Sequence, residues 1–197
     1  HQSSRVKMPF VYVDCSALNP TKLQETLFGR KGGLPRGKFR EAEGGTLFLN
    51  RLSCLPLDMQ EIINLYLKTE CIIPIGSNKP EKLTLQLILG VRGRPEGAVK
   101  RNVLSGNLVE SCTGKRLHIS PLKDRKPDVI EIAQHFFNIF LKKYRKQGMT
   151  MAPQTEIKIS NYPWPGNDRE LELILERAIL CCDHESLTPE YLALPGE

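Results

Sequence analysis

The sequence GGTLFLNR at residues 44–51 decides the fold. A Gly-Gly turn leads into four residues that are β-branched, apolar or aromatic without a break, and the run stops at the polar pair Asn50 and Arg51. An unbroken apolar run between turn signals is typical of a strand buried on both faces, the central strand of a parallel α/β sheet. Because ligands bind such sheets at the carboxyl ends of the strands, Asn50 and Arg51 become candidate site residues.

Length and composition indicate one large globular domain, or a domain with a small satellite. The chain has 197 residues, of which 40% are hydrophobic and 25% charged, so it can bury a sizeable core. No stretch approaches the ~20 apolar residues of a membrane span, and the first residues do not resemble a signal peptide. We therefore expect a cytoplasmic protein with no membrane partner. The six cysteines lack metal-ligand spacing, so we expect no metal site.

Patterns on both sides of the central strand predict alternating strands and helices. A strand is predicted at 10–13, and a helix is predicted from Pro20 to Gly29 with Asn19 as its N-cap. A basic loop follows at 30–40. A second amphipathic helix begins at Pro56, and further strands are predicted at 71–75, 83–89 and 117–119.

The last third of the chain has a helical pattern. A long helix is predicted from Pro127 to Gln147, and a final helix begins at Asn167, which we expect to cap it. Strands first and helices afterwards predict an α/β domain at 1–125 and a small all-helical domain at 126–197.

Several short motifs occur in one order along nearly the whole chain. They are PF at 9–10, DCSAL at 14–18, ETLFG at 25–29, GKF at 37–39, EA at 41–42, GGTLFL at 44–49, LPL at 55–57 with Gln60, PLKDR at 121–125, WPGN at 164–167 and REL at 169–171. Together they resemble the AAA+ domain of bacterial enhancer-binding proteins, the sigma-54-dependent transcription activators. The resemblance implies an N-terminally truncated P-loop NTPase-like core followed by a helical lid, with an expected boundary at 125/126.

The resemblance also implies where hydrolysis should occur, and the residues there have changed. The family carries an acidic pair for Mg²⁺ and water where this chain has Asn50 and Arg51, and arginine cannot act as a base. Arginine fingers are expected at the positions of Ser105 and Ser111. The family's polar phosphate-sensing residue falls where Gly90 begins a loop. We therefore predict no catalytic residues and no ATP hydrolysis.

Two family loops are absent from the sequence. The phosphate-binding loop would precede the residue that matches His1. The sigma-factor-gripping GAFTGA motif should lie between Gly29 and Gly37, where the sequence reads GRKGGLPR. The stretch GGLPRGKF at 32–39 imitates a phosphate loop, but it ends in Phe39, which has no hydroxyl for Mg²⁺, and follows a predicted helix. We interpret it as a surface loop.

One family part remains, at Arg169. It matches the lid arginine that reaches toward nucleotide phosphates, so the resemblance implies ATP or ADP as ligand if upstream residues supply a phosphate loop. The alternative is a structural arginine that pairs with Asp168, Glu170 or Glu172 on the same helix. The candidate nucleotide-binding residues are therefore Arg169, Asn50 and Arg51.

The sequence leaves three functions open. We favour a non-hydrolysing interaction or oligomerisation module of a transcription regulator, with protein partners, the transcription machinery or a second copy. The first alternative is a slow ATPase completed by upstream residues and partner subunits. The second is a nucleic-acid-binding module using the basic loops 30–40 and 92–101, for which a net charge of +6 is permissive; a solvated or protein-facing surface is favoured because few aromatic residues interleave those cations.

Overall fold

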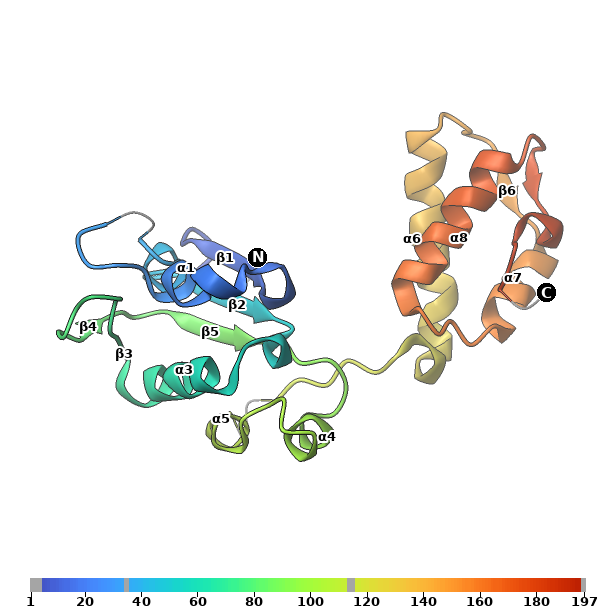
Figure 1. Cartoon of the computed structure of the whole chain (residues 1–197). Helices are drawn as coiled ribbons and strands as arrows, with labels where there is room; N and C mark the ends of the chain where they lie inside the picture. Colours follow the sequence, from blue (N-terminus) through green and yellow to red (C-terminus); the bar gives the residue numbers. More distant parts are fainter. Residues whose placement is uncertain (1–4, 34–35, 113–115, 196–197) are drawn as a thin grey trace. The chain divides into compact units, whose positions relative to one another are not determined.

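The computed structural model describes residues 5–33, 36–112 and 116–195, which form two compact units (Figure 1). The units are His1–Arg116 and Leu117–Glu197. This division precedes the expected boundary at 125/126, which stays a prediction. No helix among the described residues is both long enough and apolar enough to cross a membrane.

A parallel three-stranded sheet forms the centre of the first unit (Figure 1). The strands lie in the order β1 (Phe10–Asp14), β2 (Thr46–Asn50) and β5 (Gln86–Leu89). The register pairs Tyr12 with Phe48 and Asp14 with Asn50, so the carboxyl ends of β1 and β2 meet at one edge. The prediction of a central strand in a parallel α/β sheet is confirmed.

One face of this sheet carries the core. Leu47 and Leu49 are fully buried and pack in one cluster with side chains of α1 (Leu23–Phe28), α2 (Lys38–Glu41) and α3 (Leu57–Thr69). On the other face Tyr12 is 53% and Ile88 40% exposed, and Phe48 is half-buried. The prediction that β2 is buried on both faces was therefore wrong: among the described residues, helices cover only the face of Leu47 and Leu49.

The helix starts follow local chemistry. Asn19 Oδ1 accepts the N–H of Thr21 at 3.0 Å and caps the 3-10 turn η2 (Pro20–Lys22), which leads into α1. Gly29 ends α1 at a φ of 76°, a conformation that side chains disfavour. The predicted second helix is α3, which begins at Leu57, one residue after the predicted start at Pro56.

The remaining elements of the first unit are short. They are the 3-10 turns η1 (Cys15–Ala17) and η3 (Leu52–Cys54), the antiparallel pair β3 (Cys71–Ile72) and β4 (Glu81–Lys82), α4 (Pro95–Lys100) and α5 (Gly106–Ser111). The predicted strands at 71–75 and 83–89 are thus shorter than expected. The predicted loop at 30–40 instead contains the start of α2, because Phe39 is fully buried in the core.

The second unit is mainly helical, as predicted. Its elements are η4 (Leu122–Asp124), α6 (Lys126–Lys143), α7 (Pro153–Asn161), α8 (Asn167–Cys181), η5 (Pro189–Tyr191) and the two-residue parallel strands β6 (Thr150–Met151) and β7 (Ser186–Leu187). Val129, Ala133, Phe137 and Phe140 form the buried stripe of α6. Trp164 is buried against this core, and its Nε1 donates to Ile159 O at 2.8 Å.

Two predictions for this part of the chain were wrong. Residues 117–119 form no strand, and Leu117 is 89% and Ile119 74% exposed, because no neighbouring strand pairs with them. Asn167 does not cap α8; its Oδ1 accepts the N–H of Leu122 at 2.7 Å, and Gly166 holds the cap position. Asn167 therefore ties the start of α8 to η4.

A lysine from the loop after α6 closes the other end of α8. Lys146 Nζ donates to three carbonyl oxygens, those of Ile179 at 2.9 Å, Leu180 at 3.1 Å and Cys182 at 2.7 Å. The last carbonyls of a helix lack partners within the helix, and a cation there suits the helix dipole. Lys146 thus links two helices through one ammonium group.

Replacing this lysine should destabilise the helical unit. We predict that Lys146→Met lowers the free energy of unfolding by about 1–3 kcal/mol, because it removes hydrogen bonds from a charged donor. The matched control, Lys142→Met, changes an exposed lysine near the end of α6 and should stay within about 0.5 kcal/mol of the unmodified chain. Denaturant unfolding, followed by Trp164 fluorescence, checks both; equal stability of the two variants would contradict the role of Lys146.

Candidate functional site

Arg51 is held by an ion pair at the carboxyl edge of the sheet. It follows β2 in the left-handed conformation, at a φ of 56°. Its Nη2 lies 3.1 Å from Asp14 Oδ2 at the end of β1, and its Nη1 donates to Ser16 Oγ at 2.8 Å. The guanidinium is therefore bound between two groups of the neighbouring segment, where the family resemblance places an acidic residue.

Asn50 is similarly engaged. Its Oδ1 accepts the backbone N–H of Arg51, and its Nδ2 donates to Tyr12 Oη, each at 3.0 Å. Gly90, at the end of β5, lies close against it: a Cβ there would stand 2.8 Å from Asn50 Oδ1. A larger residue at position 90 would thus require Asn50 to move.

Hydrogen bonds keep the Asp14 carboxylate charged. Its Oδ1 accepts from Ser16 Oγ at 2.8 Å and from the N–H of Ser16 at 3.0 Å. The hydroxyl of Ser16 is the largest influence that holds the pKa of Asp14 below its ordinary value, and the Arg51 charge adds a smaller one in the same direction. The contacts of Asp14 and Ser16 with Arg51 were not predicted from the sequence. The signal available was that β1 and β2 both end at this edge of the sheet.

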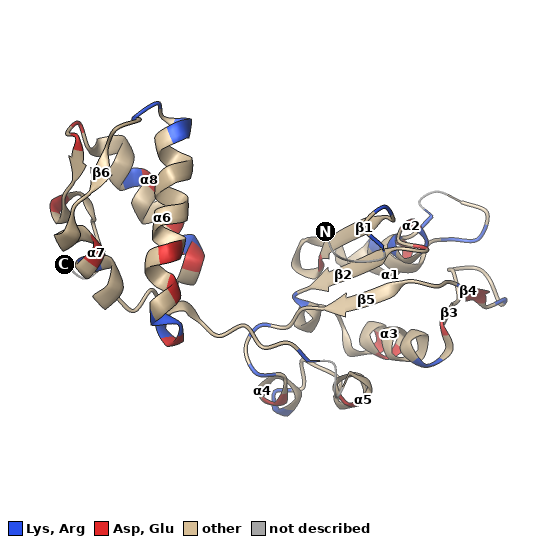
Figure 2. Ribbon diagram, turned by 180° about the vertical axis from the view of Figure 1, so that it is seen from behind, with Lys and Arg blue, Asp and Glu red and all other residues tan. Residues whose placement is uncertain are grey.

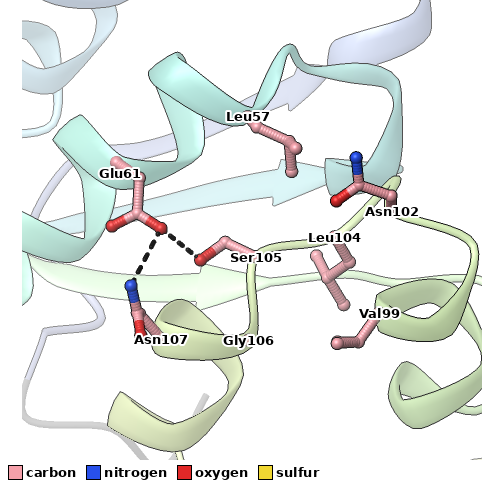
Figure 3. A pocket seen from close by; sticks show the side chains of 8 residues that line it. All are labelled: Leu57, Glu61, Val99, Asn102, Leu104, Ser105, Gly106 and Asn107. Atoms are coloured by element: carbon pink, nitrogen blue, oxygen red, sulfur yellow. Dashed lines mark hydrogen bonds between the residues drawn. The ribbon is translucent and has the colours of Figure 1, made fainter.

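The side chains at the two predicted finger positions are hydrogen-bonded to α3, although Ser111 is exposed. Ser105 is buried, and its Oγ donates to Glu61 Oε1 at 2.5 Å; Ser111 Oγ donates to Asn64 Oδ1 at 2.7 Å. Gln60 is fully buried beside them and accepts the N–H of Ser105 at 2.8 Å. These bonds fasten α5 to α3, and Figure 3 shows the one between Ser105 and Glu61. Both serines are thus used within the chain.

Arg169 lies in the first turn of α8, in the second unit, and is exposed. Among the described residues it forms no ion pair, so the alternative role, a structural arginine paired with Asp168, Glu170 or Glu172, is not what the structure shows. Asp168 instead lies 3.4 Å from Arg125, and Glu170 accepts the N–H of Gly166 at 2.7 Å.

Arg169 also lines a pocket of about 400 Å³ together with Gly166, Glu170, Leu173, Ile174 and Pro195. The pocket combines aliphatic walls with an exposed guanidinium. The predicted role of Arg169 in binding phosphate stays a prediction.

The imitation of a phosphate loop at 32–39 has other roles in its described part. Lys38 Nζ lies 2.7 Å from Glu41, and Phe39 packs in the core. Gly29 and Gly37 approach so closely that a Cβ on Gly37 would lie 2.4 Å from Gly29 N. Residues 34–35 lie outside the described residues.

The two basic loops differ in their pairing. In the first loop Arg30 pairs with Glu25, Lys38 with Glu41, and Arg40 with Glu81. In the second, Arg92, Arg94, Lys100 and Arg101 are exposed and make no ion pair within the described part of the chain; Figure 2 shows basic residues around α4. No cluster of three potential metal ligands occurs in that part.

A parallel α/β core followed by a helical second unit is the architecture of an AAA+ type of chain. Residues 1–114 match the model of the Sigma-54 interaction domain, and residues 123–195 match that of the AAA+ ATPase lid domain. The chain therefore belongs to the Sigma-54 interaction domain family.

Two curated relatives with similar sequences are transcriptional regulators. The chain is 29% identical to the sigma54-dependent transcriptional regulator SfnR of Pseudomonas fluorescens, covering 91% of this chain and 51% of that protein. It is 28% identical to the DNA-binding transcriptional regulator NtrC of Salmonella typhimurium, and the match covers 99% of this chain and 43% of NtrC. The chain thus spans about half the length of these relatives. NtrX of Brucella abortus, solved in complex with ADP, shares the fold with a TM-score of 0.86 at 24% identity, covering 97% of this chain and 45% of that one.

The contacts of Asp14 with Ser16 and Arg51 can be tested by measuring the pKa of Asp14 in two variants. Ser16→Ala should raise the pKa of Asp14 toward its ordinary value, and Arg51→Met should raise it by less, because the hydroxyl has the larger effect. A carboxyl pKa that is lowered by folding stabilises the fold at pH values above the ordinary pKa of the group. This stabilisation is lost as the pH falls through the lowered pKa. Carboxyl ¹³C titration by NMR measures the order; a larger rise in Arg51→Met would contradict it.

Proposed function

We propose that this chain is a degenerate sigma-54-activator-type AAA+ domain that works as a non-hydrolysing interaction or oligomerisation module of a cytoplasmic transcription regulator. Its partners are a second copy or components of the transcription machinery. The family membership supports the regulatory setting, since the curated relatives are transcription regulators.

The ion pair between Arg51 and Asp14 carries the proposal. Hydrolysis of a nucleotide needs a metal ion and a positioned water where charge develops. Here a guanidinium occupies the edge, 3.1 Å from the Asp14 carboxylate, and repels a divalent cation. Asn50 offers one amide oxygen, which already accepts the N–H of Arg51. The edge is therefore poorly suited to Mg²⁺.

Two further features support loss of hydrolysis. Gly90 provides no side chain to sense a phosphate, and a larger residue there would require Asn50 to move. Ser105 and Ser111 lack the charge of a finger and are bonded to α3. Trans arginines typically contribute ~10³–10⁵ in rate, so their replacement alone would be severe.

ATP or ADP binding is compatible with this proposal. Arg169 has an exposed guanidinium beside an aliphatic pocket, a combination that suits phosphate groups and a flat base. NtrX of Brucella abortus was solved with ATP, which shows that a protein of this fold can hold the nucleotide. Nucleotide would then act as a ligand rather than as a substrate.

The test combines a rate and an association measurement. We predict that the chain with Mg-ATP releases phosphate no faster than buffer, and that Asn50→Asp/Arg51→Glu does not restore release. Sedimentation velocity over a concentration series should show self-association, or binding to RNA polymerase containing sigma-54, without nucleotide.

Two results would contradict the proposal. Phosphate release above background that rises in the double variant would identify a slow ATPase. A chain that stays monomeric at every concentration and does not bind the polymerase would remove the interaction function.

A further inference from the structure

A pocket of about 250 Å³ opens between α3, α4 and α5 in the first unit (Figure 3). Its lining includes one charged residue, Glu61, together with the amides of Asn102 and Asn107. No lysine or arginine lines it. Leu57, Val99 and Leu104 supply aliphatic walls. The pocket therefore combines one negative charge with apolar surface.

The Glu61 carboxylate is fixed in position. Its Oε1 accepts from Ser105 Oγ at 2.5 Å and from Asn107 Nδ2 at 3.4 Å, and its Oε2 accepts from Asn64 Nδ2 at 3.4 Å. The Ser105 hydroxyl is the largest influence that holds the pKa of Glu61 below its ordinary value. The group is thus ionised at neutral pH and disfavours an anionic ligand.

The pocket still offers hydrogen-bond acceptors. A carboxylate has about four acceptor positions, of which the three donors to Glu61 use three. Asn107 donates to Glu61 through Nδ2, so its Oδ1 stays available as an acceptor. Asn102 Oδ1 adds another, since no hydrogen bond of its side chain occurs among the described residues.

A guanidinium matches this arrangement. It presents five N–H donors and no acceptor, and the three methylene groups before it pack well on aliphatic side chains. We propose that the Glu61 pocket receives an arginine side chain of a protein partner. This deepens the interaction-module proposal, on which it rests, by naming the chemistry of the contact.

The probe is N-acetyl-L-arginine amide, titrated into the ¹⁵N-labelled chain without nucleotide. We expect saturable shifts of the side-chain amide signals of Asn102 and Asn107. The neutral isostere N-acetyl-L-citrulline amide should cause none at equal concentration. Glu61→Gln keeps an acceptor for Ser105 but loses the charge, and it should weaken arginine binding by about fivefold, the value of an exposed ion pair of about 1 kcal/mol.

Glu110→Gln is the matched control, because Glu110 is an exposed glutamate of α5 that does not line the pocket. It should bind arginine as the unmodified chain does. Absence of saturable shifts, equal shifts with citrulline, or unchanged binding by Glu61→Gln would each overturn the proposal. Phosphate release, by contrast, would overturn the non-hydrolysing function without affecting this titration.

Discussion

The pairing of β1 with β2 is the constraint on which the rest of the site depends. Its parallel register sets Asp14 opposite Asn50 and so brings Asp14 within reach of Arg51. Two unlike charges at this distance attract, whereas two carboxylates would repel and call for a cation between them. The chain keeps the fold of the family. At this edge of the sheet, it pairs the Arg51 guanidinium with the Asp14 carboxylate.

Other side chains at the candidate site and in the second unit are also engaged in contacts within the chain. A Cβ on Gly90 would stand 2.8 Å from Asn50 Oδ1, and the serines at the finger positions are hydrogen-bonded to α3. In the second unit, Lys146 and Asn167 fasten the two ends of α8, so Arg169 projects from a well-held helix. Within each unit, these internal bonds hold helices in place.

Much of the fold could be predicted from sequence because buried strands and amphipathic helices have strong local patterns, as at residues 46–50 and 57–69. Long-range partners could not. The apolar alternation at 117–119 is typical of a strand, but only the tertiary structure reveals that no described strand pairs with it. Asn167 has the chemistry of a cap, yet its oxygen is used by Leu122. At the site, the sequence was enough to identify Asn50 and Arg51 as candidate residues. The roles of Ser16 and Glu61 became visible only in the folded structure.

The central claim is that the ion pair between Arg51 and Asp14 makes this edge of the sheet unsuited to a divalent cation. Its most direct test is paramagnetic broadening by Mn²⁺, a substitute for Mg²⁺, in ¹⁵N spectra recorded with and without ATP. The account predicts that the amide signals of Asp14, Asn50 and Arg51 keep their intensity in the unmodified chain. In Arg51→Glu the same signals should broaden, because the guanidinium is replaced by a second carboxylate. Selective broadening at this edge of the unmodified chain would show a metal site and contradict the account.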